Sequence, residues 1–474
     1  MIKIKEYFKK SSLNIEYFVI TILLISAFLP RIYLPYITIT ITGIIYLIVS
    51  RKNFNGKQYL YFAIGLLLLS TISWLYNFLI YKDINFLGLV LWWGTYLYPF
   101  LILILVSSLS FNIHIKKVFK IYTRILLFEF IFIFFQAVQI NKLWGDFATG
   151  TCWSTHILGI HFAIGIIIML HEVFQKNNRN ISVTIFFLLI FYLGLIMTAY
   201  KAQIVILMLI LVSFFLYKLI RKIILYKKQI QKYIRYISTF MVVLLVSIIT
   251  VMFTYILSDM ETTVELNVEK NVENVDKIEG NYDAEDLLIR ERWGGKIYSY
   301  KVAFIDIPKG INFISGYGPS TYTSRASGSN IRKIIYDLSR AVVSKLNLPD
   351  GNLSYLEKIL KKENSKIYDK YIGGISYRSS KDAPMTSIIS IWVELGLSGL
   401  MFFIVFFVYL FIRLKNSRRN IIKQKKFNYL VLNQYSLLLL IYFIINLFYF
   451  NYWEYPEMFV PVMTFVALAI KIEK

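Results

Sequence analysis

Two ionisable side chains lie within stretches that are otherwise almost entirely apolar. Lys201 interrupts one long apolar run, and Glu394 lies inside another, close to Trp392. A charge in such surroundings is costly to maintain, so each residue is a candidate for a functional role. A lysine can stabilise negative charge on an anionic ligand, and a carboxylate can accept a proton from a reacting hydroxyl group. In a second interpretation, Lys201 ends an apolar helix and its ammonium group reaches the lipid headgroups.

Six arginines lie in the longest polar stretch of the chain: Arg290, Arg292, Arg325, Arg332, Arg340 and Arg378. A planar guanidinium binds phosphate or carboxylate through two parallel hydrogen bonds, so several arginines together favour anion recognition. Surface ion pairing within the same stretch is an equally good explanation, because its first part is acidic. The acidic residues there are Asp259, Glu261, Glu265, Glu269, Glu273, Asp276, Glu279, Asp283, Glu285 and Asp286.

The remaining candidates are two carboxylates and two histidines. His156 stands near the start of an apolar segment, where it can act as a base or a hydrogen-bond donor, or as an interior histidine with satisfied partners. For His161 we expect a packing role. Glu129 lies within another apolar segment and is either functional or an ion-pair partner of Arg124. Asp146 is a weaker candidate for a base.

Composition shows which kind of protein must position these residues. The chain is 57% hydrophobic and only 17% charged, whereas soluble domains carry about 25% charge. Its net charge of +24 would suggest nucleic acid in a soluble protein. In a membrane protein, basic residues orient the helices and meet anionic lipid, so no nucleic-acid partner is expected. The single cysteine, Cys152, excludes an intrachain disulfide and a cysteine metal cluster.

Apolar segments long enough to cross about 30 Å of hydrocarbon recur along the chain. The predicted spans are residues 14–30, 32–50, 59–80, 86–109, 119–140, 152–173, 182–198, 200–219, 236–257, 386–412, 428–450 and 455–472. The run from 182 to 219 would overshoot the bilayer as one helix, so we expect two helices and a tight turn at Thr198–Lys201. The many tryptophans and tyrosines are expected mostly in the interfacial belts, including Trp92, Trp93, Trp453 and Tyr455.

Basic residues concentrate in alternate loops, which predicts the orientation of the spans. One set of loops includes Lys9, Lys10, Arg51, Lys52, Lys116, Lys117, Lys176, Arg179, Arg221, Lys222, Arg418 and Arg419. The other short loops hold only Arg31, Lys82, Lys142 and Lys201. Both termini are therefore expected to be cytoplasmic. The predicted organisation is nine transmembrane helices in 1–257, a large extracytoplasmic loop in 258–385, and three helices in 386–474.

The large loop is far longer than the usual connection of about 4–6 residues, and long structured loops are usually functional. Residues 297–307 are periodic enough for an amphipathic helix, and 329–346 and 354–368 also look helical. Gly316-Tyr317-Gly318-Pro319-Ser320 predicts a turn or a site of close backbone approach.

Three segments carry a family resemblance. They are Gly150–Gly159 (GTCWSTHILG); Thr198–Ala202 (TAYKA); and Tyr300–Phe304 (YKVAF) with Pro308, Gly316–Gly318 (GYG) and Ser387–Leu400 (SIISIWVELGLSGL). In their order and topology they resemble the bacterial O-antigen polymerase/O-antigen ligase superfamily. His156 stands where the family often has asparagine. Lys201 stands where the family has an arginine facing a pyrophosphate.

The resemblance implies an all-α, GT-C-like protein with about twelve transmembrane helices. It would transfer undecaprenyl-pyrophosphate-linked glycans without a metal or another cofactor. The implied catalytic residues are Lys201, Arg290, Arg292, His156 and Glu394. The implied substrate-binding residues are Arg325, Arg378, Gly316, Tyr317 and Gly318.

The expected function is polymerisation of lipid-linked oligosaccharide repeat units into a surface polysaccharide, an O-antigen, capsule or exopolysaccharide, at the bacterial inner membrane. Ligases of the family carry His-Asn just before the tenth span, where this chain has Met385-Thr386, which favours a polymerase. A glycan ligase and a polysaccharide flippase or transporter remain alternatives. The expected partners are the undecaprenyl-pyrophosphate-linked oligosaccharide and the lipid bilayer, and a chain-length regulator is a further candidate.

Overall fold

The computed structural model describes most of the apolar segments and part of the large loop. The described residues are 16–29, 33–50, 56–81, 86–109, 115–141, 148–152, 154–174, 181–198, 201–225, 241, 252, 300, 302–306, 310–321, 386–424, 427–449 and 452–471. Within them every regular element is helical and no strand occurs, which confirms the all-α prediction.

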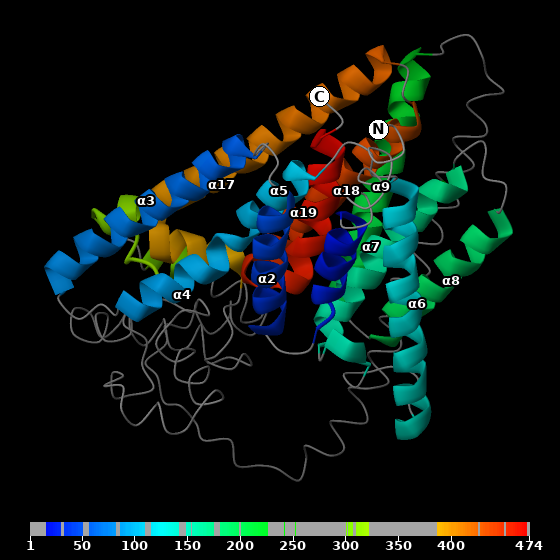
Figure 1. Cartoon of the computed structure of the whole chain (residues 1–474), viewed down its shortest axis with the longest axis horizontal. Coiled ribbons are helices and arrows are strands. Elements are labelled where there is room, and N and C mark those ends of the chain that lie inside the picture. The colour runs from blue at the N-terminus through cyan, green and yellow to red at the C-terminus, as the bar shows by residue number, and fades with distance from the viewer. Residues whose placement is uncertain are drawn as a thin grey trace. The chain divides into compact units, whose positions relative to one another are not determined.

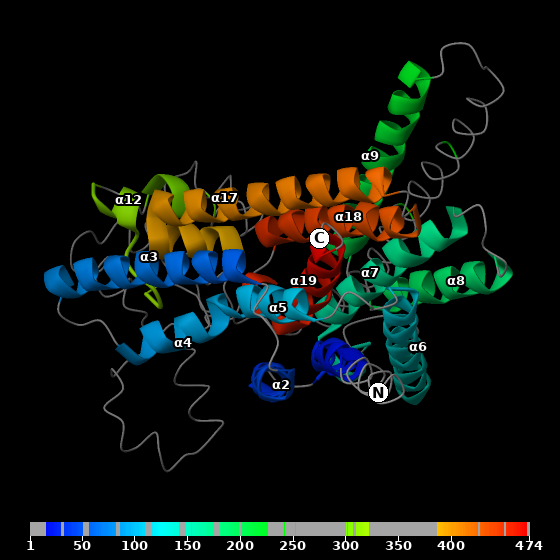
Figure 2. The same ribbon diagram turned by 45° about the horizontal axis from the view of Figure 1, so that its top comes forward.

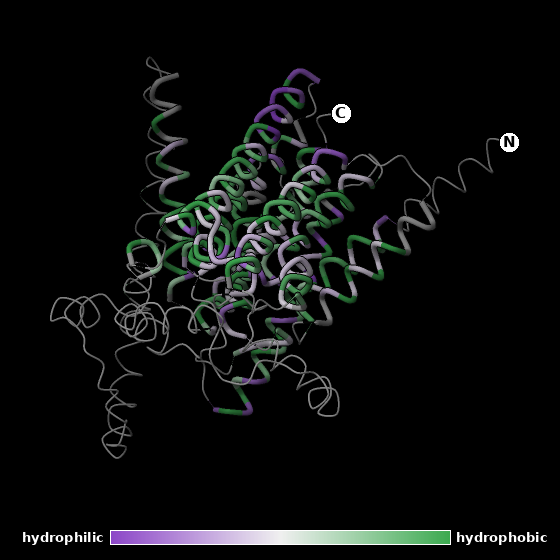
Figure 3. Tube along the Cα trace, turned by 90° about the vertical axis from the view of Figure 1, so that its left-hand side faces the viewer, coloured by the Kyte–Doolittle hydropathy of each residue, from purple (hydrophilic) through white to green (hydrophobic). Residues whose placement is uncertain are grey.

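Among the described residues, four helices are long and apolar enough to cross a membrane. They are Lys57–Ile80, Gly88–Ser108, Ser387–Lys423 and Leu432–Tyr449. Shorter apolar helices are Glu16–Ser26, Thr155–Leu170, Ile181–Met197 and Ala202–Phe214. Figure 3 shows hydrophobic residues along much of the helical trace. Each of these helices overlaps a predicted span. The predicted span 236–257 lies almost wholly outside the described residues.

The chain divides into two compact units, each described by itself. The first unit comprises Met1–Thr42, Asn112–Lys277 and Lys426–Tyr442. Its elements are α6 (Ile115–Ile140), the short 3-10 helix η1 (Gly150–Cys152), α7 (Thr155–Phe174), α8 (Ile181–Met197) and α9 (Lys201–Leu225). Helix α7 packs against α6, α8 and α9. The α7–α8 contact is close because Gly194 faces the ring of Phe162, and small residues let membrane helices approach one another.

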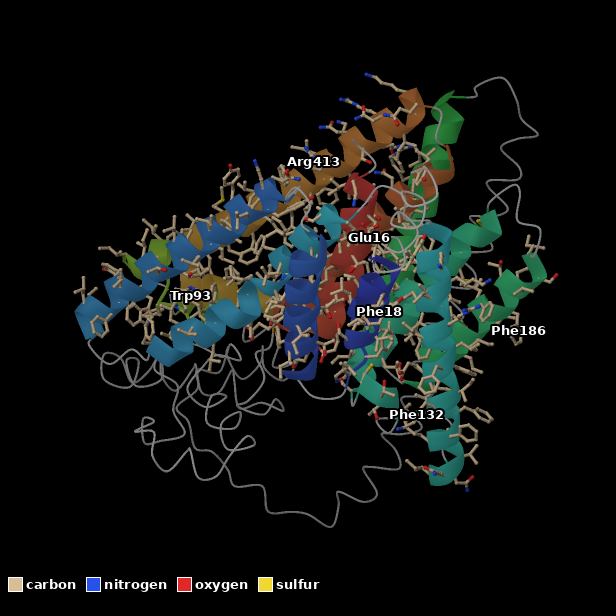
Figure 4. The ribbon with its side chains drawn as sticks, viewed as in Figure 1. Glu16, Phe18, Trp93, Phe132, Phe186 and Arg413 are labelled. Carbon is tan, nitrogen blue, oxygen red and sulfur yellow. The ribbon has the colours of Figure 1, made fainter. Side chains whose placement is uncertain are left out.

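Helices α8 and α9 confirm that the apolar run from 182 to 219 is divided. Helix α8 ends at Met197, the backbone N–H of Thr198 bonds to Gly194 O at 3.2 Å, and α9 begins at Lys201. The apolar side chains of Phe132 on α6 and Phe186 on α8 are exposed on the surface of this unit (Figure 4). Such exposed aromatic residues are suited to contact with lipid.

The second unit comprises Gly43–Phe111, Ile278–Lys425 and Phe443–Lys474. Its elements are α3 (Lys57–Tyr81), α4 (Phe86–Tyr96), α5 (Tyr98–Ser108), the π-helix η2 (Val302–Asp306), α12 (Asn312–Ser315), α17 (Ser387–Lys423), the 3-10 helix η3 (Tyr452–Glu454) and α19 (Pro456–Lys471). Helix α3 runs beside α17 (Figures 1 and 2), and α19 packs against α5 and α17. Two helices, α2 (Tyr33–Ser50) and α18 (Phe427–Tyr449), belong partly to each unit.

Local sequence explains where these helices begin and bend. The side chain of Thr386 caps α17 by accepting a hydrogen bond from the backbone N–H of Ile389 at 3.1 Å. Gly396 then interrupts α17 with a φ of 65°, a conformation that glycine adopts readily. Within the predicted span 86–109, α4 and α5 meet at Leu97, where Pro99 lacks a backbone N–H and therefore leaves one helical hydrogen bond unmade.

The loop is described only in part. The helix predicted at 297–307 is found where it is described, with Tyr300 helical and Val302–Asp306 forming a π-helix. The helices predicted at 329–346 and 354–368 lie outside the described residues.

Candidate functional site

The loop residues Tyr317-Gly318 and the helix residues Val393-Glu394 are joined by backbone hydrogen bonds, and both belong to the third segment that resembles the family. The N–H groups of Tyr317 and Gly318 donate hydrogen bonds of 2.9 Å to the carbonyls of Val393 and Glu394. These carbonyls lie beside the break in α17 at Gly396, where the regular helical partners are displaced. The loop segment therefore takes the place of a missing helical turn.

The contact depends on glycine at two positions. A Cβ atom on Gly316 would lie 2.4 Å from the carbonyl of Glu394, and one on Gly396 would lie 2.5 Å from Ile314 O. Both residues also have positive φ, at 69° and 65°. The prediction of a turn or close-approach site at Gly316-Tyr317-Gly318 is confirmed.

Helix α3 binds the other side of the same loop segment. The Ser73 hydroxyl donates a hydrogen bond of 2.6 Å to Ser315 O, and the Asn77 amide donates one of 3.1 Å to Gly316 O. Both donor side chains are buried. The loop backbone is thus held between two helices through donors and acceptors that a membrane interior would otherwise leave unsatisfied.

The carboxylate of Glu394 lies fully buried behind this contact. The Trp92 indole N–H donates a hydrogen bond of 2.6 Å to it. Trp92 stacks on Tyr96 with ring centroids 4.0 Å apart, and the Tyr96 hydroxyl donates a hydrogen bond of 2.8 Å to Glu454. A second indole N–H, from Trp453, reaches Tyr96 O at 3.2 Å. We call Trp92, Tyr96, Glu394, Trp453 and Glu454 the carboxylate cluster.

The carboxylate cluster is formed by side chains from α4, α17 and η3. Of its members, the sequence predicted only Glu394 as a site residue. Trp92 and Trp453 were predicted in the interfacial belts, and that prediction is wrong, since both are fully buried. Their indole N–H groups face polar atoms from distant segments. The sequence did hold a signal, since Trp92 and Tyr96 are spaced by one helical turn and Glu454 directly precedes an apolar segment.

An aromatic anchor joins the π-helix to α17. The Trp392 indole N–H donates a hydrogen bond of 2.8 Å to Ala303 O, and its ring stacks on Phe304 at 4.9 Å. Tyr300 stacks on Phe304, and its hydroxyl donates a hydrogen bond to Phe448 O. Burial raises the pKa of the Tyr300 phenol to about 12, so the group stays protonated and remains a donor.

The first unit contains a separate buried carboxylate. Glu129 of α6 accepts hydrogen bonds from the backbone N–H of Thr151, at 2.9 Å, and from the Thr151 hydroxyl. The neighbouring Gly150 N–H donates to Gln136 at 3.1 Å. Arg124, the partner considered from the sequence, is exposed, whereas Glu129 is buried. The carboxylate therefore fixes the Gly150-Thr151 entry to α7.

The two histidines of α7 differ in surroundings. His161 is buried, with Nδ1 2.9 Å from the Tyr122 hydroxyl and Nε2 3.1 Å from Ala27 O, which confirms a packing role. His156 is the second residue of α7 and is half-buried. Lys201 is the first residue of α9.

The structure thus brings Glu394 together with Gly316, Tyr317 and Gly318. The other implied site residues in the loop, with the weaker base candidate, lie outside the described residues: Arg290, Arg292, Arg325, Arg378 and Asp146. Within the part of the chain that is described, no group of three or more His, Cys, Asp or Glu side chains is arranged to hold a metal ion.

The sequence matches no protein-family model and no curated protein.

Proposed function

We propose that the chain is a GT-C-like inner-membrane glycosyltransferase with twelve spans and both termini in the cytoplasm. It joins undecaprenyl-pyrophosphate-linked oligosaccharide repeat units into a surface polysaccharide at the outer face of that membrane. The observation that supports the proposal best is the docking of Gly316-Tyr317-Gly318 on Val393-Glu394. The two segments are far apart in the sequence, and the family resemblance rests on both.

The proposed reaction requires no redox step. A sugar hydroxyl of one repeat unit attacks the anomeric carbon of another, and a new C–O bond forms while the bond to the pyrophosphate breaks. The hydroxyl proton passes to a base, for which His156 is the candidate. Lys201, Arg290 and Arg292 stabilise the negative charge that grows on the departing pyrophosphate, which is the main electrostatic contribution.

The role of Glu394 follows from its surroundings. A fully buried carboxylate that accepts the Trp92 N–H is not placed to touch a sugar. We therefore assign Glu394 to positioning: it fixes the broken part of α17, to which the Gly316-Tyr317-Gly318 segment binds. Arg325 and Arg378 complete the proposed substrate-binding set within the loop.

Deletion of the gene tests the proposal. The mutant should carry single-repeat glycans in place of long polymer, and a plasmid copy should restore the polymer. Unchanged polymer in the mutant would contradict the proposal. Full-length polymer accumulating on the lipid carrier would identify a ligase, and loss of all lipid-linked repeats from the outer leaflet would identify a flippase.

Substitution of Lys201 tests the residue most directly tied to the chemistry. Lys201→Ala should abolish the polymer while the protein still inserts, and Lys201→Arg should retain polymer, since it restores the residue that the family has. Lys57→Ala, at the first residue of α3, is the matched helix-end control and should leave polymer length unchanged. Equal effects of the two alanine substitutions would show that Lys201 serves only to anchor a helix.

A further inference from the structure

Residues 310–321 of the large loop are bound along the flanks of two membrane-crossing helices. Ser315 O and Gly316 O accept hydrogen bonds from α3, and the N–H groups of Tyr317 and Gly318 bond to α17. Figure 2 shows α12 beside α17, in agreement with their packing. The position of this segment along the two helices can be estimated from their geometry.

The basic ends of α3 and α17 mark one edge of the hydrocarbon. Tyr59, near Lys57, packs against Tyr409, one helical turn before Arg413, with ring centroids 6.3 Å apart. From Lys57 to Ser73 the axis of α3 rises about 24 Å. The hydrocarbon is about 30 Å thick, so Ser73 lies inside its far edge. Any tilt of α3 shortens the projected distance and places Ser73 deeper.

Helix α17 gives an independent measure. The rise from Arg413 back to Leu397, the residue after the break at Gly396, is about 24 Å, again within the thickness of the hydrocarbon, and Glu394 lies directly across that break. Since Glu394 O accepts the Gly318 N–H, the loop backbone at this point lies just inside the same edge. Both helices thus place the segment within the outer part of the bilayer rather than above it.

A non-helical backbone can enter hydrocarbon only where its polar groups are satisfied by protein. The four backbone groups closest to the two helices meet this condition, because Ser315 O, Gly316 O, Tyr317 N and Gly318 N all have protein partners. Residues Gly316 to Thr321 are buried. The part of the segment that points outward is apolar: Ile311 is 60% exposed, Phe313 42% and Ile314 59%.

We propose that residues 310–321 form a re-entrant segment that enters the bilayer and contacts lipid acyl chains through Ile311, Phe313 and Ile314. Lipid acyl chains are the expected contact, because this surface is continuous with the exposed apolar surface of the neighbouring helices. Ile72 on α3 and Leu397 on α17 are also exposed, at 66% and 38%, and belong to helices apolar enough to span. A surface at the same depth and of the same chemistry meets the same acyl chains.

Spin-label accessibility in lipid nanodiscs tests the depth. The chain has one cysteine, Cys152, which is buried, so the wild type provides the background labelling. Ile314→Cys is labelled with a nitroxide, and collisions with oxygen and with a water-soluble nickel complex are measured. Collisions with the nickel complex should be on the order of tenfold fewer than at a water-exposed site, because a polar complex partitions poorly into hydrocarbon.

Two positions on α17 serve as matched references. Leu397→Cys reports the lipid-facing surface at similar depth, and Ile422→Cys reports the basic last turn of the same helix, between Arg419 and Lys423. The proposal expects Ile314→Cys to resemble Leu397→Cys, and resemblance to Ile422→Cys would overturn it. Ile311→Cys is read by the same criterion, so the answer does not depend on one variant folding. No substrate is added, so failure here is distinct from failure of the proposed glycosyltransferase activity.

Discussion

The indole N–H of Trp92 donates a 2.6 Å hydrogen bond to the carboxylate of Glu394, a residue far away in the sequence. A buried carboxylate is tolerated only where hydrogen bonds replace its hydration. Trp92 therefore does more than fill space between α4 and α17, and the energetic value of its N–H group can be measured.

Trp92→Phe keeps an aromatic ring but removes the donor to Glu394. We expect the free energy of unfolding to fall by about 2 kcal/mol, since a fully buried acceptor loses a partner. Trp93→Phe is the matched control, because its N–H bonds to the neutral Ser70 hydroxyl at 3.0 Å in a less buried position. Unfolding in detergent measures both, and equal losses would show that the Trp92–Glu394 bond carries no special weight.

Gly316→Ala and Gly396→Ala each place a Cβ within 2.6 Å of backbone atoms and require a positive φ. We expect each to lower the free energy of unfolding by about 1–3 kcal/mol. Gly94→Ala on α4 has open space around the added carbon and should be neutral or slightly stabilising. Thermal unfolding of the purified variants compares them. Tolerance of alanine at both contact glycines would mean that the loop segment is not seated on α17.

Thr151→Val keeps the side-chain shape but removes the hydroxyl, whose partners are the Glu129 carboxylate and Phe28 O. The buried carboxylate then loses one of its two Thr151 hydrogen bonds, at an expected cost of about 1–3 kcal/mol. Thr123→Val is the control, since the Thr123 hydroxyl bonds only to Phe119 O in its own helix. Chemical denaturation measures the free energy of unfolding of both variants. A larger decrease for Thr123→Val than for Thr151→Val would contradict the assigned role of Thr151.

Tyr300 should contribute a pH-dependent share of stability. Its folded pKa of about 12 lies above the unfolded value near 10, so the folded state holds the proton more tightly. The stability gained is therefore complete below about pH 10 and is lost as the pH rises toward 12. The unfolding free energy of wild type minus that of Tyr300→Phe should be constant below pH 10 and shrink above it. A difference that grows with pH would contradict the buried position of the phenol.

Hydropathy indicated much of the helical framework, because apolar length is a local property. The division between α8 and α9 was predictable, since Lys201 and the turn at Thr198 interrupt a run too long for one span. Gly316 and Gly318 indicated a turn or a close backbone approach, because the conformational freedom of glycine is also a local property. The family resemblance also grouped the loop residues Gly316–Gly318 with the helix that begins at Ser387, as parts of one segment.

Partner choice could not be predicted, because it depends on packing between segments distant in sequence. Trp92 and Trp453 have the composition of interfacial residues, yet the carboxylates Glu394 and Glu454 lie with them in one buried cluster. Glu454 lies one residue before the predicted span 455–472, so the sequence does not place it inside the protein. Only the folded arrangement of α4, α17 and η3 shows that these residues belong together.

The break in α17 at Gly396 links the protein to bilayer thickness. Two of its carbonyls are satisfied by Tyr317 and Gly318, so lifting the loop segment would expose them where water is scarce. A bilayer with shorter acyl chains would bring water closer to this break and make release of the segment less costly, whereas longer chains would hold it in place. Lipid chain length thus acts on the same contact as the substitutions at Gly316 and Gly396.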